Sequence, residues 1–140
     1  MEIDAARDLL DGATPTIRIL YNRDNPNRAR AFALIRDSAA LAGFQVVDGG
    51  QGSADWAKSL GGSGYDAALL GWIGTSAGVS RVPQIFRTGA GSNFNGFSDP
   101  DADKAMEQLA RTTDIGKQDE ILAGIDKEIW ENAYGMPLYQ

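Results

Sequence analysis

The first half of the chain alternates between two hydrophobic patterns, one with the period of a strand and one with the period of a helix. Residues 16–22 place apolar side chains at every second position, with the β-branched and aromatic content typical of a strand. Residues 26–42 repeat apolar side chains at steps of three and four, which predicts a helix with one apolar face. The predicted elements are a helix at 3–10, a strand at 16–22, a helix at 26–42, a strand at 44–50, a helix at 53–60 and a strand at 65–74. This order predicts an α/β fold with a small, mostly parallel sheet flanked by helices, because right-handed crossovers join such strands.

Local signals set the ends of the longest of these helices. Asp24 or Asn25 can cap its free N–H groups, Pro26 suits its first turn, and Gly43 is placed to end it in a left-handed conformation. By the same reasoning, Ser53 is expected to cap the helix at 53–60. The apolar face expected on the sheet comprises Phe32, Ile35, Ala39 and Ala42.

The pattern changes in the second half of the chain. The segment Thr75–Ser98 is rich in Gly, Ser and Asn, and it predicts a long loop without secondary structure of its own. One helix is then expected to begin at residue 98 or 99, and a second to span Gly116–Asn132. The side chains expected in the core are Ala102, Ala105, Met106 and Leu109 from the first helix and Ile121, Leu122, Ile125, Ile129 and Trp130 from the second. Residues 135–140 predict an edge strand or the start of a longer element.

Composition narrows the range of functions. A chain of 140 residues that is 43% hydrophobic predicts a single folded domain over residues 1–140, and a net charge of −6 disfavours nucleic acid as a partner. The N-terminus lacks the basic and apolar regions of a signal peptide, and no apolar run approaches the roughly 20 residues of a membrane span. The lack of cysteine and histidine removes thiol and imidazole catalysis and most zinc sites. We therefore expect no catalytic residues, no cofactor and no metal site.

Two partial motifs favour structural roles. The glycine cluster "DGGQGSAD" follows a strand and precedes a helix, but Asp55 stands where a dinucleotide-binding loop needs its third glycine. The alternating Asp99, Asp101 and Asp103 begin like a calcium loop, yet Lys104 replaces the glycine that such a loop needs at its sixth position. These segments are interpreted as a tight turn and as the capped start of a helix.

Aromatic side chains give the best candidate for a binding site. Trp72 follows the third predicted strand, and ligands of open α/β sheets bind outside the carboxyl ends of the strands. Phe94, Asn95 and Phe97 lie in the long loop. The alternative is that Trp72 and both phenylalanines belong to the core, because large aromatic side chains are more often buried than exposed.

The order of these elements resembles a known family. The run "NPNRARAFALIRDSAALAGFQV", then "GYDAALLGWIG", then "SNFNGFSDPDADKAMEQLARTTDIGKQDEILAGIDKEIWENAYGMPLY" resembles the second lobe of the family 5 extracellular solute-binding proteins, the peptide-binding components of ABC importers. The resemblance implies one lobe of a periplasmic-binding-protein type II fold, within a longer, exported and in many cases membrane-anchored protein at the periplasmic or extracellular face. It also implies a monomer whose partners are a small peptide or similar solute and the importer permease subunits.

The resemblance assigns the candidate ligand-binding residues by position: Trp72, Gly74, Thr75, Asn93, Phe94 and Asn95. One departure concerns the acidic residue that pairs with the ligand's amino terminus in dipeptide-binding relatives. Here Thr75 stands near that place and no acid occurs between Trp72 and Asp99. Longer peptides held by backbone contacts, sugars and metal chelates therefore all stay open as ligands. Two rival interpretations are a small α/β enzyme using Asp48, Asp55 or Asp66, and an interaction domain using the helix Gly116–Asn132.

Overall fold

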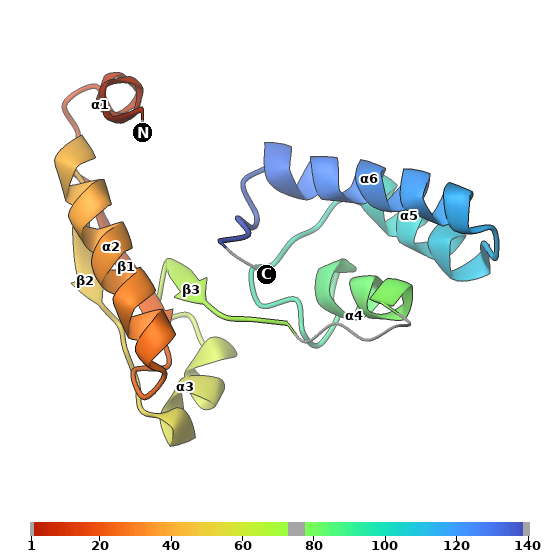
Figure 1. The fold of residues 1–140 in the computed structure, drawn as a ribbon, viewed down its shortest axis with the longest axis horizontal. Helices are drawn as coiled ribbons and strands as arrows, with labels where there is room; N and C mark the ends of the chain where they lie inside the picture. The colour runs from red at the N-terminus through yellow and green to blue at the C-terminus, as the bar shows by residue number, and fades with distance from the viewer. Residues whose placement is uncertain (1, 73–77, 139–140) are drawn as a thin grey trace. The chain divides into compact units, whose positions relative to one another are not determined.

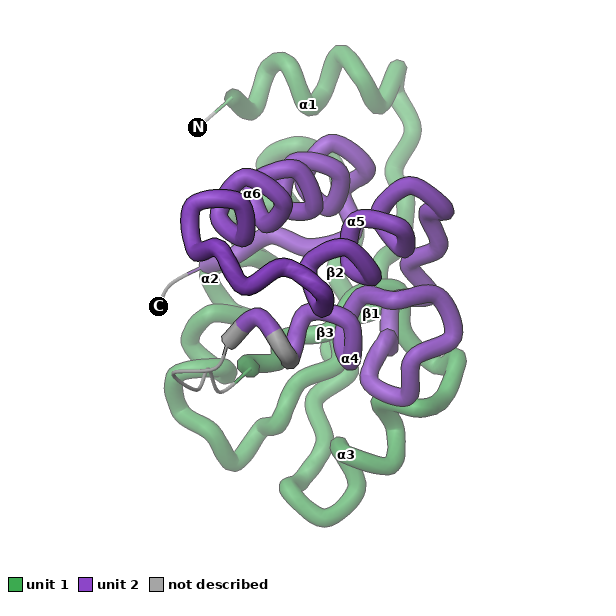
Figure 2. Tube along the Cα trace, turned by 90° about the vertical axis from the view of Figure 1, so that its right-hand side faces the viewer, with its two compact units in different colours: residues 1–72 green, residues 73–140 purple. Residues whose placement is uncertain are grey.

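A computed structural model describes residues 2–72 and 78–138 of the chain. Its contacts divide the chain into two compact units, Met1–Trp72 and Ile73–Gln140, which Figure 2 distinguishes by colour.

The first unit contains a three-stranded parallel sheet (Figure 1). Strand β1 (Thr16–Tyr21) lies in the centre, between β2 (Gln45–Asp48) and β3 (Ala67–Leu69). Helices α1 (Ile3–Leu10), α2 (Pro26–Ala42) and α3 (Ser53–Leu60) complete the unit, so the expected α/β fold with a small parallel sheet is confirmed. Strand β3 is much shorter than the predicted strand at 65–74, because its partner β1 ends at Tyr21, opposite Leu69.

Helix α2 has the predicted ends. The Asn25 side chain accepts hydrogen bonds from the backbone N–H groups of Asn27 and Arg28, and Gly43 ends the helix with a φ of 111°. The prediction for α3 is wrong in one detail: Gly52 is its N-cap, and Ser53 is its first helical residue. Ser53 instead contacts the segment after β1: its Oγ accepts from Asn22 Nδ2 at 3.1 Å, and its backbone N–H donates to Asp24 Oδ2 at 2.8 Å.

The face of the sheet under α2 forms the first hydrophobic core. Ile19, Tyr21 and Phe32 are buried there, and the rings of Tyr21 and Phe32 stack with centroids 4.7 Å apart. The glycine turn after β2 is packed closely against β1, because a Cβ on Gly49 would lie 2.7 Å from the carbonyl oxygen of Ile19. The glycine cluster is thus a tight strand-to-helix turn, as predicted.

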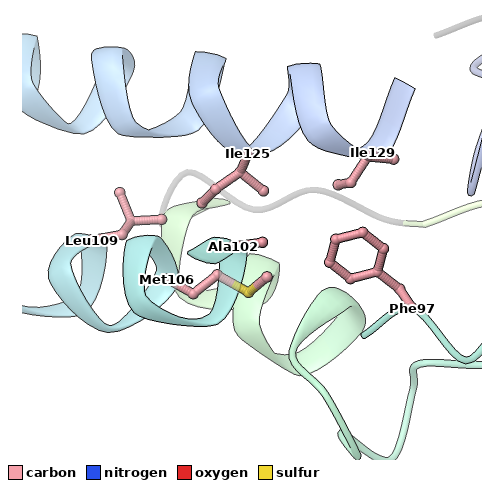
Figure 3. Close-up of a cluster of buried hydrophobic side chains, with 6 residues drawn as sticks. All are labelled: Phe97, Ala102, Met106, Leu109, Ile125 and Ile129. Atoms are coloured by element: carbon pink, nitrogen blue, oxygen red, sulfur yellow. The ribbon is translucent and has the colours of Figure 1, made fainter. Parts of the chain in front are cut away.

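The second unit is helical in its described part. It contains the short 3₁₀ helix η1 (Gly78–Arg81), α4 (Val82–Phe86), α5 (Pro100–Arg111) and α6 (Ile115–Glu131). Helices α5 and α6 lie side by side and enclose the second core, shown in Figure 3. The buried members of that core are Phe97, Ala102, Met106, Leu109, Ile125 and Ile129.

Three expectations for this unit need correction. The segment Thr75–Ser98 is not without secondary structure, because η1 and α4 lie within it. Trp130 is 58% exposed: it follows Ile129 by one residue, about 100° further around the helix, and so turns away from the core. Residues 135–138 form no strand, since the described residues of this unit provide no strand with which they could pair.

No helix in the described ranges combines the length and the apolar character that crossing a bilayer requires.

Candidate functional site

Trp72 lies just beyond the carboxyl end of β3, three residues after Leu69. Its side chain is 42% exposed, so the interpretation of Trp72 as a core residue does not hold in this structure. The residue is therefore at the edge of the sheet where α/β proteins bind ligands, and its ring is accessible. Gly74 and Thr75 lie outside the described residues.

The loop of residues 93–97 is held in place by the side chain of Asn93. Its Nδ2 donates to the carbonyl oxygens of Arg87 (3.0 Å) and Phe97 (2.7 Å), and its Oδ1 accepts from the Phe97 N–H (2.9 Å). Phe97 is 1% exposed and packs edge-to-face against Tyr134, with centroids 4.6 Å apart. The amide of Asn93 thus clamps the loop onto the core, so its polar atoms are already engaged within the loop.

Phe94 and Asn95, which follow Asn93 in this loop, are exposed. Phe94 is 37% exposed, and Asn95 is exposed while its Nδ2 donates to the backbone oxygen of Tyr134. Gly96 has a φ of 67°, a left-handed conformation that favours glycine, which lets the chain turn back into the core at Phe97. The predicted residues Asn93, Phe94 and Asn95 therefore form one loop, with Asn93 as its support and the other two on its surface.

A polar network surrounds the carboxyl ends of β1 and β2. Asp48 Oδ1 accepts from the Gly50 N–H at 2.7 Å and from Arg23 Nη2 at 3.5 Å. Burial alone would raise the pKa of Asp48, but hydrogen bonds from Gly50, Tyr21 and Arg23 outweigh it and the pKa is lowered. Burial raises the pKa of Tyr21, so at neutral pH this edge carries an ionised Asp48 beside a neutral phenol.

A second network joins the end of β1 to the start of α3. Asn22 Nδ2 donates to Ser53 Oγ at 3.1 Å, and the Ser53 N–H donates to Asp24 Oδ2. The backbone and side-chain hydrogen bonds from Ser53 lower the pKa of Asp24. These contacts fix the chain on both sides of the glycine turn.

Two residues at this edge were missed by the sequence reasoning. The guanidinium carbon of Arg28, in the first turn of α2, lies 4.9 Å from the ring centroid of Trp56 in α3. A Cβ on Gly71, the residue before Trp72, would lie 3.7 Å from Arg28 Nη2. The residues come from three separate segments, so no local pattern in the sequence marks the contact.

The carboxylates proposed for an enzyme are separated in the structure and serve other roles. Asp48 ends β2 whereas Asp66 precedes β3, and the central strand β1 lies between those two strands. Asp66 Oδ2 accepts from the Arg18 N–H at 2.7 Å, and Asp55 forms an exposed i,i+3 pair with Lys58. No two of the three therefore make the paired arrangement of a general acid and base.

The helix proposed as an interaction surface already uses its apolar stripe. Ile125 and Ile129 are buried against α5, and Ile121 and Leu122 pack against the same core. This burial weakens the interpretation of the helix as an interaction surface for another protein.

No family model matches the chain. The oligopeptide-binding protein OppA of Mycobacterium tuberculosis is 28% identical over 132 residues, which cover 93% of this chain and 22% of OppA. The chain is homologous to part of OppA. An uncharacterized lipoprotein of the same organism, Rv2585c, is 28% identical over 144 residues, covering 97% of this chain and 25% of that protein. The chain thus spans about a quarter or less of the length of the curated relatives it matches.

A solved structure confirms the expected fold. The ABC transporter substrate-binding protein CtaP of Listeria monocytogenes superimposes with a TM-score of 0.81 at 17% identity, over 92% of this chain and 28% of that one. The fold is that of a periplasmic binding protein of type II, as the resemblance implied. OppA and CtaP are both named as binding proteins, which supports the expectation of a non-enzymatic role.

Proposed function

We propose that this chain is one ligand-binding lobe of a solute-binding protein that delivers peptides or related solutes to an ABC importer. The observation that carries the proposal is the homology to OppA over nearly the whole chain, together with an exposed Trp72 at the carboxyl edge of the sheet. In this proposal, a second lobe supplied by the rest of the protein closes on the ligand.

Trp72, Gly74, Thr75, Phe94 and Asn95 face the ligand in the proposed site. Asn93 belongs to the site as the residue that supports the loop, since its amide contacts Arg87 and Phe97. The proposal also includes what the family resemblance implies: a monomeric protein at the periplasmic or extracellular face, anchored to the membrane, whose partners are the importer's permease subunits. The name of the relative Rv2585c, a lipoprotein, supports the membrane anchor. Residues 1–140 then act as one domain of that protein.

The test uses the full-length native protein and isothermal titration with a pool of di- and tripeptides. Trp72→Ala is expected to weaken binding by about tenfold or more, because stacking and burial against a large aromatic ring contribute on the order of 1.4 kcal/mol or more. The matched control is Trp130→Ala, which removes another exposed tryptophan (58%) from α6 and should leave affinity unchanged.

Two results would contradict the proposal. Unchanged affinity in the Trp72 variant with a large loss of thermal stability would make Trp72 a structural residue. Equal loss of affinity in both variants would show that the effect does not arise at the proposed site.

A further inference from the structure

Asn95 is followed directly by Gly96, and no other asparagine of the chain precedes a glycine. Both residues are exposed, on the loop that enters the core at Phe97. The side chain of an asparagine can react with the backbone nitrogen of the next residue. A glycine in that place hinders the reaction least, because it has no Cβ and turns freely about its backbone bonds.

The backbone N–H of Gly96 donates to no acceptor among the described residues, whereas the nitrogen after every other asparagine is engaged. One of those nitrogens belongs to Pro26 and carries no hydrogen. The others donate to acceptors within 3.5 Å: Arg23 to Gln51 O, Arg28 to Asn25 Oδ1, Phe94 to Ser92 O and Ala133 to Trp130 O. A nitrogen whose proton is held in a hydrogen bond must first break that bond in order to react. Within the described ranges, Asn95 thus has a neighbouring nitrogen that is ready to react.

The side chain of Asn95 is held by a single hydrogen bond, from its Nδ2 to the backbone oxygen of Tyr134. The core contact at Phe97 depends instead on Asn93, which makes three hydrogen bonds. The space around Gly96 is open, since a Cβ built there would meet nothing within 4 Å. Exposed loops open locally far more often than the whole domain unfolds. The Asn95 side chain can therefore leave Tyr134 and reach the Gly96 nitrogen while the core stays folded.

We propose that the pair Asn95–Gly96 is a site of spontaneous deamidation. The Gly96 nitrogen attacks Cγ of Asn95 and gives its proton to solvent. The new bond from nitrogen to Cγ replaces the bond from Cγ to Nδ2, and Nδ2 leaves as ammonia. Water then opens the succinimide ring at either carbonyl carbon, which yields aspartate or isoaspartate. The net reaction converts an amide and water into a carboxylic acid and ammonia, and it requires no oxidant or reductant.

The product differs from Asn95 in hydrogen bonding and in charge. An ionised carboxylate only accepts hydrogen bonds, so the contact with the Tyr134 carbonyl oxygen is lost. The new carboxylate is also an acid in a stretch, between Trp72 and Asp99, that contains none. The modification does not depend on the proposed function, but it falls on the surface that faces the ligand in that proposal.

The experiment incubates the full-length native protein at neutral pH and body temperature and follows every asparagine by peptide mapping with mass spectrometry. Electron-transfer fragmentation distinguishes aspartate from isoaspartate. A synthetic peptide with the sequence of residues 90–100 is the unfolded reference.

The matched control is the variant Ala133→Gly, which places a glycine after the exposed Asn132. Ala133 has a φ of 55°, which glycine adopts readily, so the variant should keep its fold. Its backbone N–H donates to Trp130 O at 3.0 Å. The control therefore has the same pair of residues as the proposed site but an engaged nitrogen.

Asn95 is expected to convert about tenfold or more faster than every other asparagine of the wild type, and than Asn132 in the variant, because those nitrogens must first break a hydrogen bond. Its rate in the folded protein should lie within about tenfold of the rate in the peptide. A larger slowing in the folded protein would overturn the inference, since the fold would then protect the pair. Equal rates for Asn95 and for Asn132 in the variant would also overturn it, because the free nitrogen would not set the rate. The comparison with the peptide uses only the wild type, so it decides the matter even if the variant fails to fold.

Discussion

Replacing Asn93 with alanine tests whether this residue stabilises its loop or contacts the ligand directly. The substitution removes three hydrogen bonds at once, at 3.0 Å and 2.7 Å from Nδ2 and at 2.9 Å to Oδ1. Two of them satisfy the backbone of Phe97, whose side chain is 1% exposed. The loop that enters the core at Phe97 thus depends on this one amide.

The expected loss of stability follows from these contacts. Each hydrogen bond contributes about 0.5–1.5 kcal/mol net, and a buried backbone group left without a partner costs about 1–3 kcal/mol. The three bonds share one side chain, so their contributions do not simply add. We expect Asn93→Ala to lower the free energy of unfolding by about 2–3 kcal/mol.

Urea denaturation followed by circular dichroism measures this loss, with the midpoint and slope fitted separately. The control is Asn95→Ala, which removes one hydrogen bond from an exposed side chain to Tyr134 and should cost about 1 kcal/mol or less. A loss below about 0.5 kcal/mol for Asn93→Ala, together with a large drop in peptide affinity, would refute the reasoning. Asn93 would then act on the ligand directly, as its place in the sequence first suggested.

Two further changes test the first unit. Gly50→Ala should lower the free energy of unfolding by about 1–3 kcal/mol, because its Cβ would lie 2.7 Å from Cζ of the buried Tyr21. Thermal melting measures this loss. The control is Gly64→Ala, whose Cβ would meet nothing within 4 Å and which should leave the melting temperature nearly unchanged. Hydrogen bonds from Ser53 lower the pKa of Asp24 in the folded state. The ionised carboxylate of Asp24 therefore stabilises the folded protein at a pH above the unfolded-state pKa, and this stabilisation is lost as the pH falls through the folded-state pKa. Asp24→Asn should therefore reduce the acid dependence of unfolding between neutral pH and about pH 3, and an unchanged dependence would count against that hydrogen-bonded carboxylate.

Helix ends that are set by neighbouring residues were predicted correctly from the sequence. Both ends of α2 were predicted because Asn25, Pro26 and Gly43 each act within one turn of the helix. The start of α5 was predicted for the same reason, since the Asp99 side chain accepts from the N–H groups of Asp101 and Ala102. Capping is a local interaction, and the residue types alone reveal it.

Features set by distant partners were not predicted. The length of β3 depends on where β1 ends, and Ser53, at the start of α3, contacts Asn22 and Asp24 in another segment. The contact of the Arg28 guanidinium with the Trp56 ring, 4.9 Å from the ring centroid, joins two helices that are separated by a strand and a turn. Of the candidate site, the accessible Trp72 and Phe94 followed from position and residue type, but the use of the Asn93 amide within its own loop required the structure.

The central claim, that this chain is a ligand-binding lobe, is tested most directly on the full-length native protein with pools of di- and tripeptides. Native mass spectrometry and thermal melting are recorded with and without each pool. We expect an adduct of peptide mass and a raised melting temperature, since ligand at about 100 times its Kd stabilises the folded state by about 2.7 kcal/mol. No adduct and no shift with any peptide pool or with the nickel complex of EDTA, at millimolar concentrations, would contradict it.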